Sequence, residues 1–199
     1  LKEVAAEACK RIDVGAAVLP KPLFSADAED YNGDEELRDV ARSVETHYAR
    51  VLHQEFNSIV VEHHLKWAPL SVSEPGPLPG GEPSSRLGRY DFHYAESVVD
   101  WALDHDMKVK GHVLVWHVTS PKLIEEMEPV TVRAQLKRHI FTLMGHFRGR
   151  IKVWDVVNEA LAPDGTIAEN VFFRKLGAEY IEDCFRWAHE ADPSATLLY

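Results

Sequence analysis

The chain of 199 residues lacks any apolar run approaching the roughly 20 residues that a membrane-spanning helix needs. It also lacks a signal peptide, and it begins with Leu1 rather than Met, so we expect a processed or trimmed start. Basic residues are outnumbered, 22 against 32 acidic ones, and the net charge is -10. Nucleic acids and anionic membranes attract clustered Lys and Arg, so we expect neither as a partner.

Cysteine is scarce too, with only Cys9 and Cys184 in the chain. Cys184 lies at an apolar position of a predicted helix, which favours a small core residue over a disulfide. The sequence contains no G-x-G-x-x-G turn, no G-x-x-x-x-G-K-[ST] loop and no G-x-S-x-G elbow. These absences argue against a dinucleotide site, a phosphate-binding loop and a serine nucleophile, and we expect no cofactor.

Short apolar runs alternate with amphipathic helical patterns along the chain. Strands are predicted at 11–19, 57–62, 107–117, 150–160 and 195–199. The helical stripes between them include Tyr48 and Val51, then positions 92–102, 132–147 with Thr131 as N-cap, and 180–188. Such alternation predicts an α/β fold, a parallel sheet covered by helices.

Two architectures fit this pattern, an open doubly wound sheet and a (β/α)8 TIM barrel. A barrel typically takes about 250 residues in eight units. If the fold is a barrel, the sequence holds four βα units and the start of strand five. We then expect one incomplete domain over residues 1–199, and the sequence does not indicate its oligomeric state.

Polar side chains gather at the predicted strand ends, where ligand sites form in both architectures. Those after strand two are Glu62, His63, His64 and Lys66, those on strand three are His112, Trp116 and His117, and those on strand four are Asn158 and Glu159. Taken singly, most would be ordinary loop charges or core residues. Taken together on three consecutive strands, they favour a functional site.

A metal site is the first alternative. On a regular strand, His112 and His117 face opposite sides because they are an odd number of residues apart, and the neighbours His63 and His64 diverge likewise. The sequence has no H-E-x-x-H and no paired C-x-x-C, so a metal would need ligands from different strands. Because they are an even number of residues apart, His112 and Trp116 lie on the same face of the strand, where both side chains can line one cavity.

Acid catalysis fits the remaining residues better. Asn158 and Glu159 can enter one site only if the strand ends or bulges there, and mid-strand Asp155 is expected to be a hydrogen-bonded structural carboxylate. A glutamate near aromatic walls can have a raised pKa and act as a general acid. An indole such as that of Trp116 offers a flat face to a sugar ring. Glycoside hydrolysis requires such an acid and a second carboxylate.

Four stretches together resemble glycoside hydrolase family 10, the endo-1,4-β-xylanases with a (β/α)8 barrel: "FNSIVVEHHLKW", "GHVLVWH", "WDVVNEA" and "GAEYIEDCFRWAHEADPSATLLY". The similarity runs from about Phe56 to Tyr199. It implies a secreted, retaining hydrolase that cleaves internal β-1,4-xylosidic bonds, with xylan or xylo-oligosaccharide as its partner. It implies no metal.

The resemblance also assigns roles to single residues. Glu159 matches the general acid/base, and Asn158 matches the amide that bonds the sugar 2-hydroxyl and the nucleophile. His117 matches a histidine near the acid/base strand. In the family this histidine contacts the residues of the site and not the sugar itself. The positions that hold sugars are Glu62, His63, Lys66, His112 and Trp116.

Departures from the family pattern leave chain-length and side-group preference open, since His63, Thr119 and Leu123 stand where the family usually has Asn, Gln and Trp. The family's nucleophile is a glutamate of strand seven, so we expect these 199 residues alone to bind sugar poorly and not to hydrolyse it. One alternative is a non-catalytic polysaccharide-binding protein on the same scaffold. Another is a metal-dependent barrel hydrolase. The loop at 69–90 either shapes the cleft or is a flexible insertion.

Overall fold

The computed structural model describes residues 1–7, 12–24, 46–72, 87 and 89–199. Cys9, the early part of the first predicted helix and most of the loop at 69–90 lie outside the described residues. The chain forms two compact units, Leu1–His64 with His93–Lys110, and Leu65–Phe92 with Gly111–Tyr199. In the described ranges, every helix is too short or too polar to cross a bilayer. That residues 1–199 form one domain stays a prediction.

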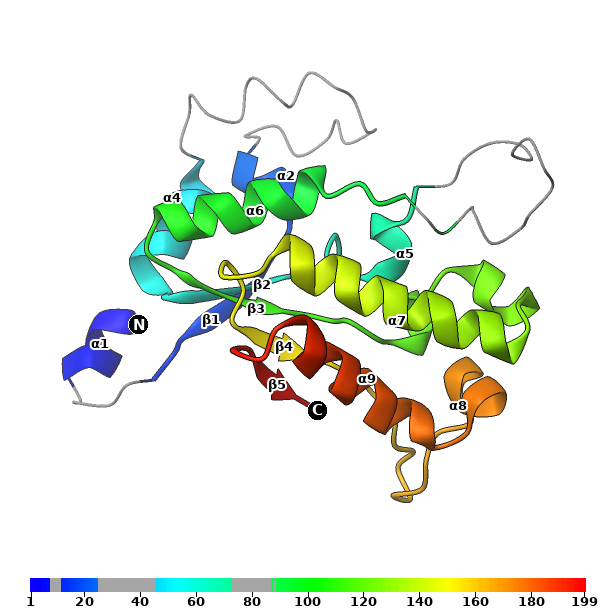
Figure 1. Ribbon diagram of the computed structural model, residues 1–199. Helices are drawn as coiled ribbons and strands as arrows, with labels where there is room; N and C mark the ends of the chain where they lie inside the picture. Colours follow the sequence, from blue (N-terminus) through cyan, green and yellow to red (C-terminus); the bar gives the residue numbers. More distant parts are fainter. Residues whose placement is uncertain (8–11, 25–45, 73–86, 88) are drawn as a thin grey trace. The chain divides into compact units, whose positions relative to one another are not determined.

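The first unit is a parallel arrangement of three strands with helices between them (Figure 1). Its elements are α1 (Lys2–Glu7), β1 (Gly15–Val18), α2 (Pro20–Phe24), α4 (His47–Glu55), β2 (Ser58–Val61), α6 (His93–Asp104) and β3 (Lys108–Gly111), whose last residue belongs to the second unit. Val18 pairs with Val61, and Ile59 with Val109. All three strands therefore point the same way, as the alternating pattern predicts.

Helix α6 buries Ala95, Val98, Val99 and Ala102, as expected from their spacing. Phe92, expected on the same buried stripe, precedes the helix and is half-buried. Helix α4 differs from its prediction. The Thr46 side chain caps it by accepting from the Ala49 amide at 3.0 Å, and the helix buries Ala49 and Leu52. Val51 was expected on the buried stripe but is 39% exposed, because the face of α4 toward α2 is the one that carries Ala49 and Leu52.

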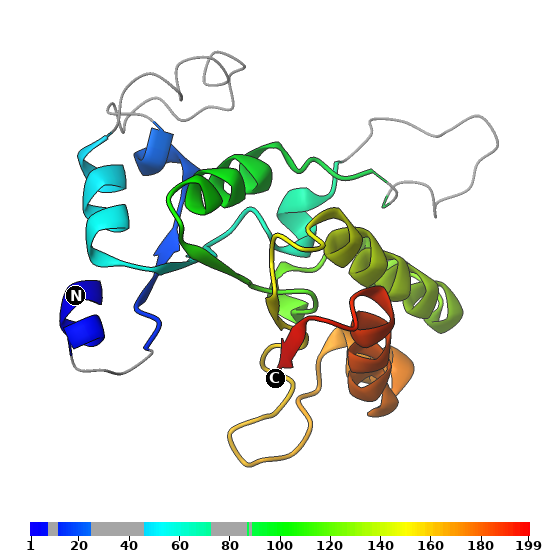
Figure 2. The same cartoon turned by 60° about the vertical axis from the view of Figure 1, so that its left-hand side comes forward.

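The second unit contains two parallel strands and the longest helices. Its elements are α5 (Trp67–Leu70), η2 (His117–Thr119), η3 (Lys122–Glu126), α7 (Pro129–His146), β4 (Val153–Asp155), α8 (Val171–Leu176), α9 (Glu179–Ala191) and β5 (Thr196–Leu198). Trp154 of β4 pairs with Leu197 of β5 in parallel register. Helices α7 and α9 lie side by side in both views (Figure 1; Figure 2).

Helices α7 and α9 pack through the apolar stripes that the sequence shows. The buried residues include Val132, Leu136, Ile140 and Leu143 on α7, and Tyr180, Cys184 and Ala188 on α9. Cys184 is a buried free thiol, as predicted. The predicted N-cap of α7 is wrong: the helix begins at Pro129 with Glu128 as N-cap rather than at Thr131, and proline is favoured at a first helical position because its missing N–H is not needed there.

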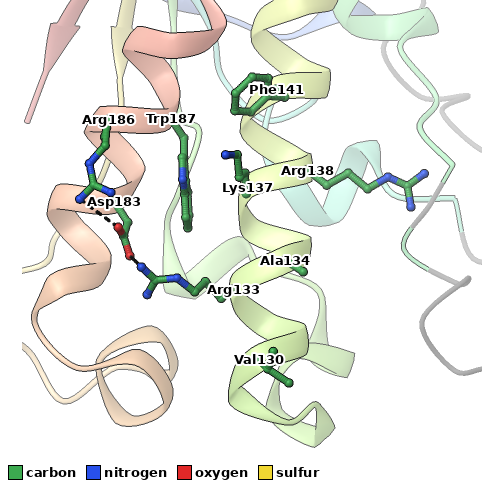
Figure 3. A pocket seen from close by; sticks show the side chains of 9 residues that line it. All are labelled: Val130, Arg133, Ala134, Lys137, Arg138, Phe141, Asp183, Arg186 and Trp187. Carbon is green, nitrogen blue, oxygen red and sulfur yellow. Dashed lines mark ion pairs between the residues drawn. The ribbon is translucent and has the colours of Figure 1, made fainter.

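A groove runs between α7 and α9 (Figure 3). It is lined by Val130, Arg133, Ala134, Lys137, Arg138, Phe141, Asp183, Arg186 and Trp187. Asp183, whose side chain is 2% exposed, forms ion pairs with Arg133 and with Arg186, the latter at 3.2 Å. Lys137 lies 3.5 Å from Glu190. Arg133 and Lys137 of α7 are thus paired with carboxylates of α9, and these two pairs link the helices, whereas the Arg186–Asp183 pair lies within α9.

Candidate active site

Two adjacent backbone segments carry the central residues of the site, all within the second unit. Beyond β3, the Leu114 amide donates to the Asp155 carbonyl at 3.0 Å, and the Val115 amide donates to Val156 at 2.9 Å. The Asn158 amide then donates back to the Val115 carbonyl at 2.9 Å. The segment that precedes Trp116 and the segment that precedes Glu159 therefore end side by side.

The Trp116 indole and the Glu159 carboxyl meet where these segments end. The indole N–H donates to Glu159 Oε2 at 2.8 Å. Strand β4 ends at Asp155, and Glu159 adopts a φ of +53°, a left-handed conformation uncommon for residues other than glycine. The prediction that the strand must end before Asn158 and Glu159 is confirmed.

Glu159 is exposed rather than enclosed by apolar walls. The sequence led us to expect enclosure because Glu159 follows the buried run through Val157. The left-handed turn at Glu159 takes the side chain out of that buried line. Its carboxyl is held by the indole of Trp116 and is open to a ligand.

Lys66 approaches the same indole from a different element. It is the N-cap residue of α5, and its ammonium lies 4.9 Å from the centroid of the Trp116 ring. A cation at this distance is attracted by the negative face of the ring. The structure therefore brings together Lys66, Trp116 and Glu159.

His112 pairs with Asp155 at 2.8 Å between Nδ1 and Oδ2. The side chains are 23% and 13% exposed. An ionised carboxylate can only accept, so Nδ1 carries the hydrogen and Nε2 is left for another partner. The His112 ring centroid lies 6.2 Å from that of Trp116. Asp155 is thus the hydrogen-bonded carboxylate that its mid-strand position indicated.

The sequence did not single out His139, which supports this site from behind. It is fully buried on α7, with Nε2 2.9 Å from the Leu114 carbonyl and Nδ1 3.1 Å from the Tyr90 hydroxyl. Trp67 stacks on its ring at 4.3 Å. Burial lowers the pKa of His139 to about 3, so the imidazole is neutral. A histidine within the apolar stripe of a helix was the available signal.

Glu62, His63 and His64 follow β2 in the first unit, where Glu62 and His63 are exposed. The His64 ring lies 5.0 Å from that of Tyr94 and 5.4 Å from that of His63. Burial, and next the charge of His63, lowers the pKa of His64 to about 4. That Glu62 and His63 hold sugar together with residues of the second unit stays a prediction.

For Asn158 and His117, no side-chain hydrogen bond among the described residues defines a role in the site. Asn158 is half-buried, and its amide belongs to the ladder with Val115. His117 begins η2, and its buried Nδ1 has no hydrogen-bond partner within the described part of the chain. Their sugar-binding and supporting roles stay predictions. Over the described ranges, no group of three or more His, Cys, Asp or Glu side chains is placed to hold a metal.

The family model described as glycosyl hydrolase family 10 matches residues 32–199. The chain belongs to this family. The family 10 fold is a (β/α)8 barrel, and the parallel strands and alternating helices of the chain are part of it. The predicted fold class is therefore confirmed, and the doubly wound alternative is excluded.

Related proteins are identical to the chain at about a third of the aligned positions. It is 39% identical over 154 residues to endo-1,4-beta-xylanase B of Thermotoga neapolitana, covering 76% of the chain and 41% of the relative. Xylanase 10B of Thermotoga petrophila RKU-1, solved in complex with xylobiose, is 34% identical with a TM-score of 0.77; all of the chain and 52% of that protein align. The chain thus spans about half the length of its relatives or less.

A second solved relative bears on cellular location. The intracellular xylanase of Thermoanaerobacterium saccharolyticum JW/SL-YS485 is 28% identical, with a TM-score of 0.69, and 94% of the chain aligns with 52% of that protein. A structural relative of the chain is thus described as intracellular. Secretion of the protein that carries this chain stays a prediction.

Proposed function

We propose that the protein carrying this chain hydrolyses internal β-1,4-xylosidic bonds of xylan with retention of configuration. The observation that carries this proposal is the Glu159 carboxyl, exposed at a strand end and hydrogen-bonded to Trp116 at 2.8 Å. Lys66 and His112 add a cation and an imidazole near the same indole. Membership of family 10 and the xylobiose bound by a relative support xylan or xylo-oligosaccharide as the substrate.

Glu159 acts as acid and then as base in this proposal. Its protonated carboxyl gives a proton to the departing glycosidic oxygen while a second carboxylate attacks the sugar. The resulting carboxylate then takes a proton from the water that releases the sugar. Retaining enzymes hold the two carboxyl groups about 5–5.5 Å apart. The family resemblance assigns the second one to a glutamate of strand seven, outside these residues.

Replacing Glu159→Gln tests the acid role because it preserves shape and removes the titrating proton. We expect kcat/KM on xylan to fall by roughly 10²–10⁴-fold, the usual contribution of a general acid. Aryl xylosides whose leaving groups need no proton should lose far less in kcat/KM. Both substrates are measured by initial rates in the protein that carries the chain.

A Glu126→Gln variant provides the control, since Glu126 is an exposed carboxylate of η3. It should leave both activities unchanged. If Glu159→Gln retains full xylan turnover, the acid assignment is wrong. If the unmodified protein binds xylan without cleaving it, the non-catalytic polysaccharide-binding alternative replaces hydrolysis.

The 199 residues by themselves should bind xylo-oligosaccharides weakly and release no reducing sugar, because one carboxyl cannot perform double displacement. The comparison is between this chain and the longer protein, at equal molar concentration. Hydrolysis by the isolated chain would show that its own carboxylates suffice, which would contradict the assigned nucleophile.

A further inference from the structure

Trp116 is engaged both at its N–H edge and on one face of its ring. We propose that Trp116 is a positioning residue, whose indole N–H holds the Glu159 carboxyl in the orientation needed for proton transfer. The inference rests on the proposed glycosidase function. It gives Trp116 a task different from the sugar-stacking that its aromatic ring first suggested.

The edge contact is the direct evidence. The Nε1 atom of Trp116 lies 2.8 Å from Oε2 of Glu159. In the described part of the chain, no other side chain donates a hydrogen bond to that carboxyl. Glu159 is exposed, so without this donor its side chain would be free to sample several rotamers in water. One hydrogen bond therefore selects the orientation.

The face contact fixes the indole itself. The Lys66 ammonium lies 4.9 Å from the ring centroid, and the attraction between cation and ring restrains the ring plane. That face is occupied by the ammonium, so it is not a bare platform for a sugar. The ring is thereby used through its N–H edge.

The backbone also brings donor and acceptor close together. Trp116 follows Val115 and Glu159 follows Asn158, and these two preceding residues are joined by a 2.9 Å hydrogen bond. His139 also binds the Leu114 carbonyl from within α7 at 2.9 Å. The segment that carries the indole is therefore anchored to the core.

Proton transfer explains why such an anchor matters. A general acid must lie within about 2.6–3.2 Å of the oxygen that it protonates. With Oε2 occupied by the indole, Oε1 is the oxygen that carries the proton to the glycosidic oxygen as the C–O bond breaks. Water returns a proton to Oε1 in the second step. A displacement of about 1 Å costs roughly 100-fold in rate.

The sharpest test replaces Trp116 with benzothienylalanine, in which sulfur takes the place of the indole N–H. Ring size and aromatic face remain, and only the donor is lost. In the protein that carries the chain, we expect kcat/KM on xylan to fall about 100-fold. On a dinitrophenyl β-xylobioside, which needs no acid to depart, we expect no more than a few-fold loss.

Trp116→Phe serves as a second variant and should show the same difference between substrates. Unchanged thermal unfolding of both variants establishes that they fold. Equal losses on the two substrates would mean that Trp116 only binds sugar, and would overturn the inference. Unchanged xylan hydrolysis would overturn it equally.

A readout that needs no activity separates this inference from the proposed function. The indole N–H of Trp116 is assigned in ¹H–¹⁵N spectra by its loss in Trp116→Phe. Glu159→Ala should shift that signal upfield and speed its exchange with water. An unmoved signal overturns the inference even in an active xylanase. A moved signal supports the contact even if xylan is not the substrate.

Discussion

Asp155 decides which nitrogen of His112 is available to a ligand. The 2.8 Å contact between Nδ1 and Oδ2 places the hydrogen on Nδ1, which leaves Nε2 as an acceptor while the ring is neutral. Asp155 lies between strand and site and is mostly covered, at 13% exposure. Asp155 can thus set the hydrogen-bonding polarity of His112, the residue for which sugar binding is predicted.

Asp155→Asn should mix the two tautomers of His112, because an amide can either donate or accept. Long-range ¹H–¹⁵N spectra of the imidazole distinguish the tautomers directly. Losing a charge-assisted bond worth about 1.5–3 kcal/mol should lower the free energy of unfolding by about that amount. Xylo-oligosaccharide binding should weaken only in proportion to the fraction of His112 in the wrong tautomer. Asp164→Asn is the control, since Asp164 is exposed and its Oδ1 bonds Thr166. A single His112 tautomer in both variants would contradict the prediction.

At the scale of elements, the packing of β4 within the second unit depends on the glycine at position 111. A Cβ atom added to Gly111 would lie 2.1 Å from Cε3 of Trp154, well inside contact distance. Trp154 is 1% exposed and has no room to withdraw. The residue at the end of β3 must therefore be glycine for β4 to lie where it supports the site.

Gly111→Ala should lower the free energy of unfolding by about 1–3 kcal/mol, the usual cost of overpacking a core. Gly145→Ala is the matched opposite case. Gly145 lies in α7, and a Cβ atom added there would meet no neighbouring atom within 4 Å, so alanine should stabilise by about 0.5–1 kcal/mol. Urea unfolding of both variants measures the two effects. Equal shifts would show that Trp154 yields to the added methyl group.

The sequence predicted which strands exist more accurately than the residues at which they begin and end. All five strands form where apolar runs occur, yet the third was expected over 107–117 and ends at Gly111. Parity along a regular strand therefore does not apply to His112 and Trp116, although their rings do come within 6.2 Å. Apolar composition predicts that a run is buried, whereas ladder hydrogen bonds decide where it stops being a strand.

At the scale of the whole molecule, buried histidines couple stability to pH. Burial lowers the pKa of His139 to about 3, against an ordinary 6.5 in the unfolded chain. As pH falls below 6.5, His139 binds a proton in the unfolded chain but stays neutral in the folded chain. This contribution to stability is complete above pH 6.5 and is lost progressively toward pH 3.

The free energy of unfolding should therefore fall by about 2 kcal/mol between pH 7 and pH 5 from His139 alone. Chemical denaturation at both pH values measures the difference. His139→Gln should reduce the dependence on pH, because its side chain does not titrate. His189→Gln, at an exposed position, should leave the dependence unchanged. An unchanged slope in His139→Gln would show that other groups cause the acid sensitivity.

The sequence by itself determined the alternation of strands and helices and the family, and it led to the proposal of Glu159 as the acid. These depend on local periodicity and on motif residues that lie close together in the chain. Only the tertiary structure decided that Trp116 donates to Glu159, that Asp155 holds His112, and that His139 anchors the segment between them. The first two pairs are each 43 residues apart. Such contacts depend on where neighbouring strands end in space, which no local pattern specifies.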